Sequence, residues 1–103
     1  MIITWLPEAE NELNLAAEWY ESRVAGLGAR LVSEVIALLD HLVFAPRAHA
    51  LVAGAAGKAG ARRALVAHFP FALVYTLRDG DELVVVALLH TSRSRKPWRK
   101  RLS

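Results

Sequence analysis

The chain has 103 residues, 54% of them hydrophobic, which is enough for one packed core and too little for two domains. The formal net charge of +3 is uneven, because residues 90–103 carry six basic side chains and no acidic one, while residues 1–89 carry more acidic than basic side chains. The sequence has no Cys, no apolar run of membrane-spanning length and no basic N-terminal signal region, which excludes disulfides and predicts a cytoplasmic protein without a membrane partner.

Residues 2–5, IITW, are typical of a strand, and Pro7 ends this strand at a position where a helix can begin. From Glu8 to about Ser22, apolar residues at helical spacing form one stripe: Ala9, Leu13, Ala16, Ala17 and Tyr20. Leu15 and Trp19 lie off this stripe, on an otherwise acidic face. An exposed Leu and Trp there predict a contact with a protein partner. The alternative is packing against residues 47–61 of the same chain.

A second helix is predicted after Gly26 and Gly28 and extends to about Phe44, with an apolar arc wide enough to contact more than one neighbour. The short glycine-containing turn indicates an antiparallel helical hairpin that lies on a sheet. Residues 47–61 follow Pro46 and are rich in Ala and Gly without a period. We expect residues 50–61 to be the most mobile internal segment, because their small side chains bury little apolar area.

Three further strands are expected at residues 62–68, 71–77 and 82–90, and RDGD at 78–81 is typical of a hairpin turn. The last two strands are apolar on both faces, as central strands are. The prediction is one α+β domain over residues 1–103, with the order β-α-α-β-β-β. A helical hairpin would pack on an antiparallel sheet and be followed by a basic C-terminal segment.

Basic side chains gather near two strand ends. Arg62 and Arg63 open the second strand and point to opposite faces of the sheet, while His90, Arg93 and Arg95 follow the last strand. We expect these groups to share one rim, where guanidinium groups could hold a phosphodiester and an imidazole could move a proton. The alternative is that these charges are merely solvated. No metal and no cofactor is predicted, because the histidines are not spaced with acids as in a zinc site.

Three motifs together point to one family. They are PEA at residues 7–9 after the first strand, R-R-x-x-V-x-x-F-P-F-x-x-V-Y from Arg62 to Tyr75, and H-x-x-R-x-x-x-x-W from His90 to Trp98. The sequence resembles the RelE/ParE superfamily of type II toxin-antitoxin toxins over essentially its whole length. It is nearest the ParE-like "plasmid stabilisation" branch.

The resemblance implies a small α+β toxin that a cognate antitoxin neutralises by wrapping the helical hairpin and sheet. It also implies one of two targets, DNA gyrase for a ParE-like inhibitor or ribosome-bound mRNA for a RelE-like, metal-independent endonuclease. A superfamily member that has lost toxicity and persists as a binding module is the third alternative. A homodimer or a hetero-oligomer with the antitoxin fits each of these readings. The sequence favours gyrase, since no acidic residue between Asp40 and Asp79 could serve as a base.

Each of these readings assigns a binding or catalytic role to particular residues. Leu15 and Trp19 are assigned to the antitoxin. The residues assigned to the target are Arg93, Arg95, Lys96, Trp98 and Arg99. A RelE-like activity would use Arg62, Arg63, His90 and Arg93. Within the C-terminal segment we expect Arg93, Arg95 and Trp98 to matter more than Lys100 and Arg101, because they lie closer to the rigid end of the last strand.

Overall fold

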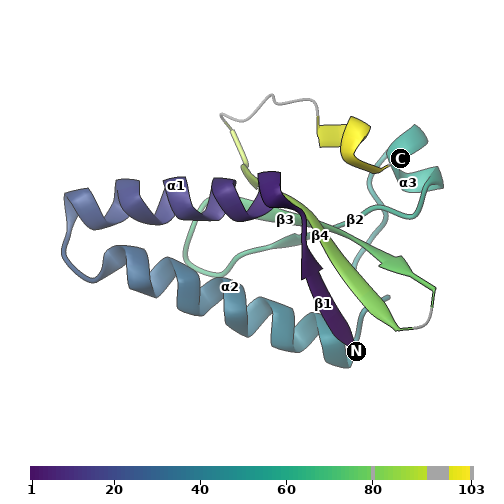
Figure 1. Cartoon of the computed structure of the whole chain (residues 1–103), viewed down its shortest axis with the longest axis horizontal. Coiled ribbons are helices and arrows are strands. Elements are labelled where there is room, and N and C mark those ends of the chain that lie inside the picture. The colour runs from purple at the N-terminus through teal and green to yellow at the C-terminus, as the bar shows by residue number, and fades with distance from the viewer. Residues whose placement is uncertain (80, 93–97, 103) are drawn as a thin grey trace.

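The computed structural model describes residues 1–79, 81–92 and 98–102, in which a helical hairpin covers one face of a four-stranded sheet (Figure 1). Its elements are β1 (Ile2–Trp5), α1 (Pro7–Arg23), α2 (Leu27–Phe44), α3 (Ala55–Lys58), β2 (Arg62–Leu65), β3 (Phe71–Arg78), β4 (Glu82–His90) and the 3-10 helix η1 (Trp98–Leu102). The predicted α+β class and β-α-α-β-β-β order are confirmed, with α3 and η1 added. None of the described helices is long and apolar enough to span a membrane.

The sheet has the strand order β1-β4-β3-β2, and one pairing departs from the prediction. The contacts of β3 with β2 and β4 are antiparallel, but β1 pairs with β4 in parallel, so the sheet is mixed. The helical hairpin lies between β1 and the later strands in the chain and supplies the long connection that a parallel pair needs. β2 is also shorter than predicted, because the chain turns after Leu65 and His68 adopts a left-handed backbone with φ of 67°.

The hairpin is fixed by one side chain at its turn. The Glu21 carboxylate accepts hydrogen bonds from the backbone N–H groups of Gly26 at 2.7 Å and Gly28 at 2.9 Å. These bonds, that of Gly26 above all, hold the pKa of the Glu21 carboxyl below its ordinary value. At Gly28 the helices approach so closely that a Cβ would lie 2.4 Å from the Ala17 carbonyl oxygen. Glycine is therefore required where α2 begins.

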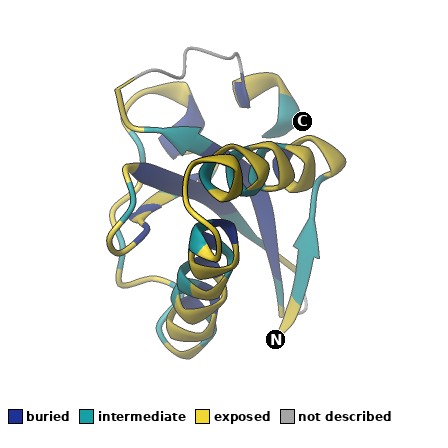
Figure 2. Ribbon diagram, turned by 90° about the vertical axis from the view of Figure 1, so that its left-hand side faces the viewer, coloured by how far each residue is buried: buried dark blue, intermediate teal, exposed yellow. Residues whose placement is uncertain are grey.

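The sheet has a packed cluster of buried side chains on each face. Its central strands are accordingly coloured as buried in Figure 2. Leu73, Tyr75 and Val85 face the hairpin, while Val74 and Val84 face the side of α3 and η1. The alternation along β4 shifts at a bulge, because Val74 pairs with Ala87 and Tyr75 with Val85, which leaves the residue at 86 without a partner on β3. Both faces of the central strands are therefore covered, as their apolar sequences predict.

The segment after α2 is more structured than predicted. Residues 55–58 form α3, and Ala56 and Ala61 are buried in the cluster on the sheet face opposite the hairpin. The Val52 N–H donates to the Ala61 carbonyl at 2.9 Å, and a Cβ at Gly57 would lie 1.8 Å from the Val52 carbonyl oxygen. The expectation that small residues would bury too little area was wrong, because small side chains let this backbone approach the sheet closely. Mobility in solution stays a prediction.

Replacing Gly57 by Ala is expected to lower the free energy of unfolding by about 2 kcal/mol, because the new methyl group would overlap backbone that cannot move away cheaply. Urea denaturation measures the change. The control is Ala59→Ser at an exposed position two residues later. Equal stability of the two variants would show that α3 is not held against the residue at 52.

Candidate functional site

The structure separates Arg62 and Arg63 from His90, although these residues were expected to share one rim. Arg62 pairs with Tyr75, which pairs with Val85 in the middle of β4, whereas His90 pairs with Phe71 at the end of β4. Two successive antiparallel pairings make β2 and β4 run in the same direction, so the start of β2 lies beside the earlier part of β4. The prediction that Arg62 and Arg63 share a rim with His90 was wrong, because Arg62 and His90 lie roughly 15 Å apart along the strands, at about 3.3 Å per residue.

Arg62 is engaged with the backbone that follows α2. Its Nη1 donates to the carbonyl oxygen of His49 at 2.6 Å and to that of Arg47 at 3.4 Å. Beside it, the Tyr75 hydroxyl donates to the Pro46 carbonyl at 2.7 Å. Burial raises the pKa of the Tyr75 phenol, and the Arg62 charge acts in the opposite direction. In this arrangement Arg62 and Tyr75 hold the chain after α2 against the sheet.

Arg63 is exposed, and its partner on β3, Val74, belongs to the cluster on the opposite face of the sheet from the hairpin. His90 lies toward the hairpin, where its ring meets Phe71 edge to face at 5.4 Å. The His90 Nδ1 lies 3.2 Å from the Ser92 backbone N and accepts its hydrogen bond. Arg62, Arg63 and His90 therefore do not form one catalytic constellation. Arg93, the fourth residue of the RelE-like set, lies outside the described residues.

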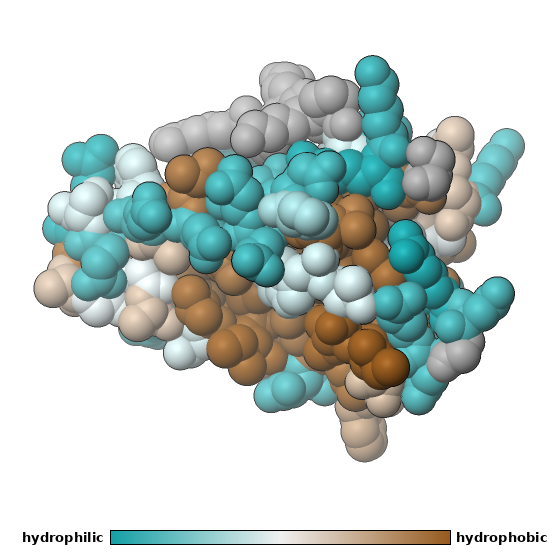
Figure 3. Space-filling model, in the orientation of Figure 1, coloured by the Kyte–Doolittle hydropathy of each residue, from teal (hydrophilic) through white to brown (hydrophobic). Residues whose placement is uncertain are grey.

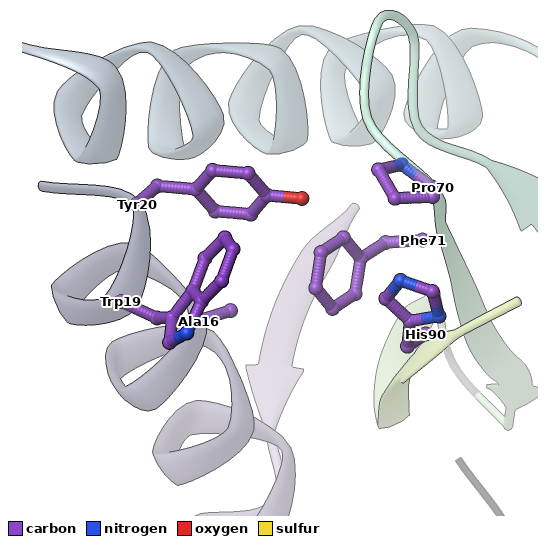
Figure 4. A pocket seen from close by; sticks show the side chains of 6 residues that line it. All are labelled: Ala16, Trp19, Tyr20, Pro70, Phe71 and His90. Carbon is purple, nitrogen blue, oxygen red and sulfur yellow. The ribbon is translucent and has the colours of Figure 1, made fainter. Parts of the chain in front are cut away.

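His90 instead borders a cavity of about 320 Å³ between α1 and the start of β3. Figure 4 shows Trp19 and Tyr20 on one side of this cavity and Pro70, Phe71 and His90 on the other. The cavity joins the end of the last strand to the helix that carries the predicted antitoxin contacts. Sequence reasoning missed it, because Tyr20 was assigned to the core and is in fact only partly buried.

Leu15 and Trp19 are exposed, as the sequence predicts, at 52% and 47% of their full surface. The Trp19 ring stands edge to face with Tyr20 at 5.0 Å, and the Arg23 guanidinium lies 4.7 Å from its centre. The alternative was that these two residues pack within the chain. About half of each side chain nevertheless stays open to a partner. Their role as antitoxin contacts stays a prediction.

The C-terminal segment is anchored by two side chains. Trp98 is 7% exposed and packs on the sheet face opposite the hairpin, with the Arg99 guanidinium 5.0 Å from its ring centre. Arg101 forms a two-pronged ion pair with Glu12 of α1, at 2.9 and 3.1 Å. Arg101 is thus fixed by an ion pair with a distant helix, although it lies late in the segment. The expected ranking of Arg93, Arg95 and Trp98 above Lys100 and Arg101 stays a prediction.

Burial of Trp98 gives its indole a packing role in this structure, and Arg99 and Lys100 lie exposed on the same short helix. The other residues assigned to the target, Arg93, Arg95 and Lys96, lie outside the described residues. Within the part of the chain that the structure describes, no group of three or more His, Asp or Glu side chains is placed to hold a metal ion. Among the described residues at the C-terminal end, the exposed basic side chains are therefore those of η1.

Comparison with known proteins gives a consistent picture. Residues 3–95 match the family model described as "ParE toxin of type II toxin-antitoxin system, parDE". The structure is similar to a solved chain described as "Chromosomal ParDE TA system from P. aeruginosa", with a TM-score of 0.73 and 16% sequence identity over 89% of this chain and 97% of that chain. No curated protein matches the sequence. At this identity the solved chain shows a shared fold, whereas the family match rests on the sequence itself.

Proposed function

Because the chain belongs to the ParE toxin family of type II toxin-antitoxin systems, we propose that it inhibits DNA gyrase and that a cognate antitoxin neutralises it. The observation that carries the choice of gyrase is the dispersal of the candidate catalytic groups. Arg62 is engaged with backbone carbonyls, while His90 lies at the far end of β4. A general acid-base mechanism needs its groups within hydrogen-bond reach of one reacting site. A binding inhibitor has no such requirement.

The basic C-terminal segment is proposed as the surface that meets gyrase. It is held on the sheet by Trp98 and tied to α1 by Arg101, so Arg99 projects from a fixed support. Positive charge at the edge of an interface steers association with a negatively charged partner. The proposal extends to Arg93, Arg95 and Lys96 on the strength of the sequence.

The choice of target is tested in bacteria that express the chain under an inducible promoter. We expect incorporation of labelled thymidine into DNA to stop before incorporation of labelled methionine into protein, because loss of gyrase activity blocks replication before it affects translation. Arrest of protein synthesis first, with cleaved transcripts, would favour the ribosome-dependent endonuclease. Unimpaired growth at high expression would favour a non-toxic binding module.

The antitoxin is proposed to contact Leu15 and Trp19 on the exposed face of α1. Truncating Trp19 to Ala is expected to weaken the complex by about 2 kcal/mol, or about thirtyfold in Kd, because large aromatic anchors dominate such interfaces. Isothermal titration with the antitoxin encoded beside this chain measures the change. Leu51→Ala is the matched control, since Leu51 is exposed to 49% on the loop after α2. An equal loss of affinity in both variants would contradict the assignment of the antitoxin contact to α1.

A further inference from the structure

Two cavities meet at Tyr20 and Pro70, which line both of them. The first, of about 320 Å³, is the one that Trp19, Phe71 and His90 border. The second has a volume of about 420 Å³, and its other lining residues are Leu27, Arg30, His68 and Phe69. They adjoin at these two residues, between the C-terminal half of α1, the start of α2 and the turn from β2 to β3, and are treated together as one groove. We call it the Tyr20 groove.

The walls of the Tyr20 groove are a set of rings already fixed against one another. Tyr20 meets Trp19 and Phe69 edge to face, each at 5.0 Å, and meets Phe71 at 6.2 Å. Such contacts hold the rings in place, so a partner would not have to order them on binding. Each cavity is near the lower end of the range for drug-sized ligands, about 300–1,000 Å³, which suits one inserted side chain.

The fixed charges at the groove are the guanidinium groups of Arg30 and Arg23. None of the described residues that line either cavity is acidic, while Arg30 and His68 line the second cavity and His90 the first. Arg23 adds a guanidinium over the outer side of Trp19. The Glu34 carboxylate is bonded to His68 and so already has a partner within the chain. An occupant with carboxylates therefore complements this rim.

We propose that the antitoxin inserts a large apolar side chain between Trp19, Tyr20 and Phe71 and places an acidic residue beside Arg30. This inference rests on the proposed function, because the occupant is the antitoxin. A nucleobase would also stack on aromatic rings, but reading its edges takes several polar partners. The side chains of Ala16, Pro70 and Phe71 offer no polar partner, so in the first cavity only Trp19, Tyr20 and His90 could supply one. The exposed Leu15 extends the apolar surface along α1. A protein segment covers that length.

The test uses helical peptides selected by display on the purified full-length chain, and their affinities are then measured by fluorescence polarisation. We expect the selected peptides to share a large apolar residue with Asp or Glu about one helical turn away. Ala16→Trp, which fills the first cavity, should weaken them by about tenfold or more. Ala37→Trp on the exposed face of α2 is the control and should leave affinity unchanged.

Arg30→Glu tests the charge without altering the core, since Arg30 is exposed. It should weaken the acidic peptides and strengthen versions with Lys in place of Asp or Glu, whereas Arg78→Glu at the far end of β3 should do neither. Peptides that bind Ala16→Trp as well as wild type, or that carry no acidic residue, would overturn the proposal. So would oligo(dT) or oligo(rA) binding that Ala16→Trp abolishes, because the groove would then belong to nucleic acid.

Failure of this inference and failure of the proposed function give different results. A chain that arrests DNA synthesis in cells but selects no peptide at the Tyr20 groove would refute the groove and leave the toxin assignment intact. A chain that leaves DNA synthesis unaffected yet selects acidic, apolar peptides at this groove would refute the gyrase proposal alone.

Discussion

Replacing Arg101 by Met is expected to lower the free energy of unfolding by about 3 kcal/mol, because the Glu12 carboxylate would stay buried without its charged partner. The Glu12 side chain is 8% exposed, and its Oε1 also accepts a hydrogen bond from the Leu88 N–H at 3.1 Å. Arg101 Nη1 donates in addition to the Val86 carbonyl at 3.0 Å, at the bulge of β4. The hydrogen bond to Glu12, together with the charges of Glu12 and Glu8, raises the pKa of the Arg101 guanidinium, and burial acts in the opposite direction.

Urea denaturation measures this loss, with Arg99→Met as the neighbouring control. Arg99 is exposed, and its guanidinium lies over the Trp98 ring at 5.0 Å from the ring centre, so its replacement should change stability by less than about 0.5 kcal/mol. Adding Glu12→Gln to Arg101→Met should restore most of the stability, because a neutral amide oxygen can still accept from Leu88. Arg101→Met as stable as Arg99→Met would show that the ion pair contributes little.

The second prediction with a large effect separates the two targets. Replacing three basic residues near the C-terminus, Arg95, Lys96 and Arg99, by Ser is expected to weaken gyrase inhibition by about tenfold or more, because their side chains supply the proposed binding surface. Supercoiling of relaxed plasmid by purified gyrase, titrated with each variant, measures the effect. The same three-charge reduction elsewhere, at Arg47, Lys58 and Arg78, should change the inhibitory concentration by less than about threefold.

His90→Ala completes this comparison. It should change gyrase inhibition by less than about threefold, since a binding inhibitor transfers no proton through an imidazole. Loss of all activity in His90→Ala, with binding retained, would instead indicate a chemical step at the end of β4. Equal losses in the two three-charge variants would indicate that net charge, rather than the C-terminal surface, controls inhibition.

Local patterns in the sequence were enough to predict the hairpin. The helical stripe that begins after Pro7 and the glycines at 26 and 28 predict two helices, and the structure places them at Pro7–Arg23 and Leu27–Phe44. The continuous apolar runs of β3 and β4 predict central strands, because burial on both faces removes the polar alternation. These features depend on neighbours along the chain, which is why they can be read directly.

Features that depend on distant partners could not be predicted in this way. The Glu12–Arg101 pair joins residues 89 positions apart, and nothing in either local sequence identifies the other. The bulge at Val86 shifts the facing of every later residue of β4 and depends on the pairing with β3. α3 forms because the sheet offers a surface to small residues, whereas the sequence alone shows only their low hydrophobic area.

The candidate site likewise has one part that local sequence predicts and one part that depends on distant contacts. Exposure of Leu15 and Trp19 follows from helical spacing, and the structure places both on the open face of α1. The brown areas of Figure 3 show that apolar side chains reach the surface over much of the face drawn there, so exposure by itself does not define the partner site. The Tyr20 groove required the tertiary contact of α1 with the β2–β3 turn, because its two walls come from segments about fifty residues apart.

Inhibition of gyrase is measured by adding the purified chain to DNA gyrase and relaxed plasmid in the presence of ATP. We expect loss of supercoiling activity and accumulation of gyrase-cleaved DNA at a small molar excess, with ribosome-bound mRNA intact in a parallel translation extract. Gyrase that stays fully active at a high excess of the chain, together with cleavage of the ribosome-bound mRNA, would contradict the proposed inhibition of gyrase.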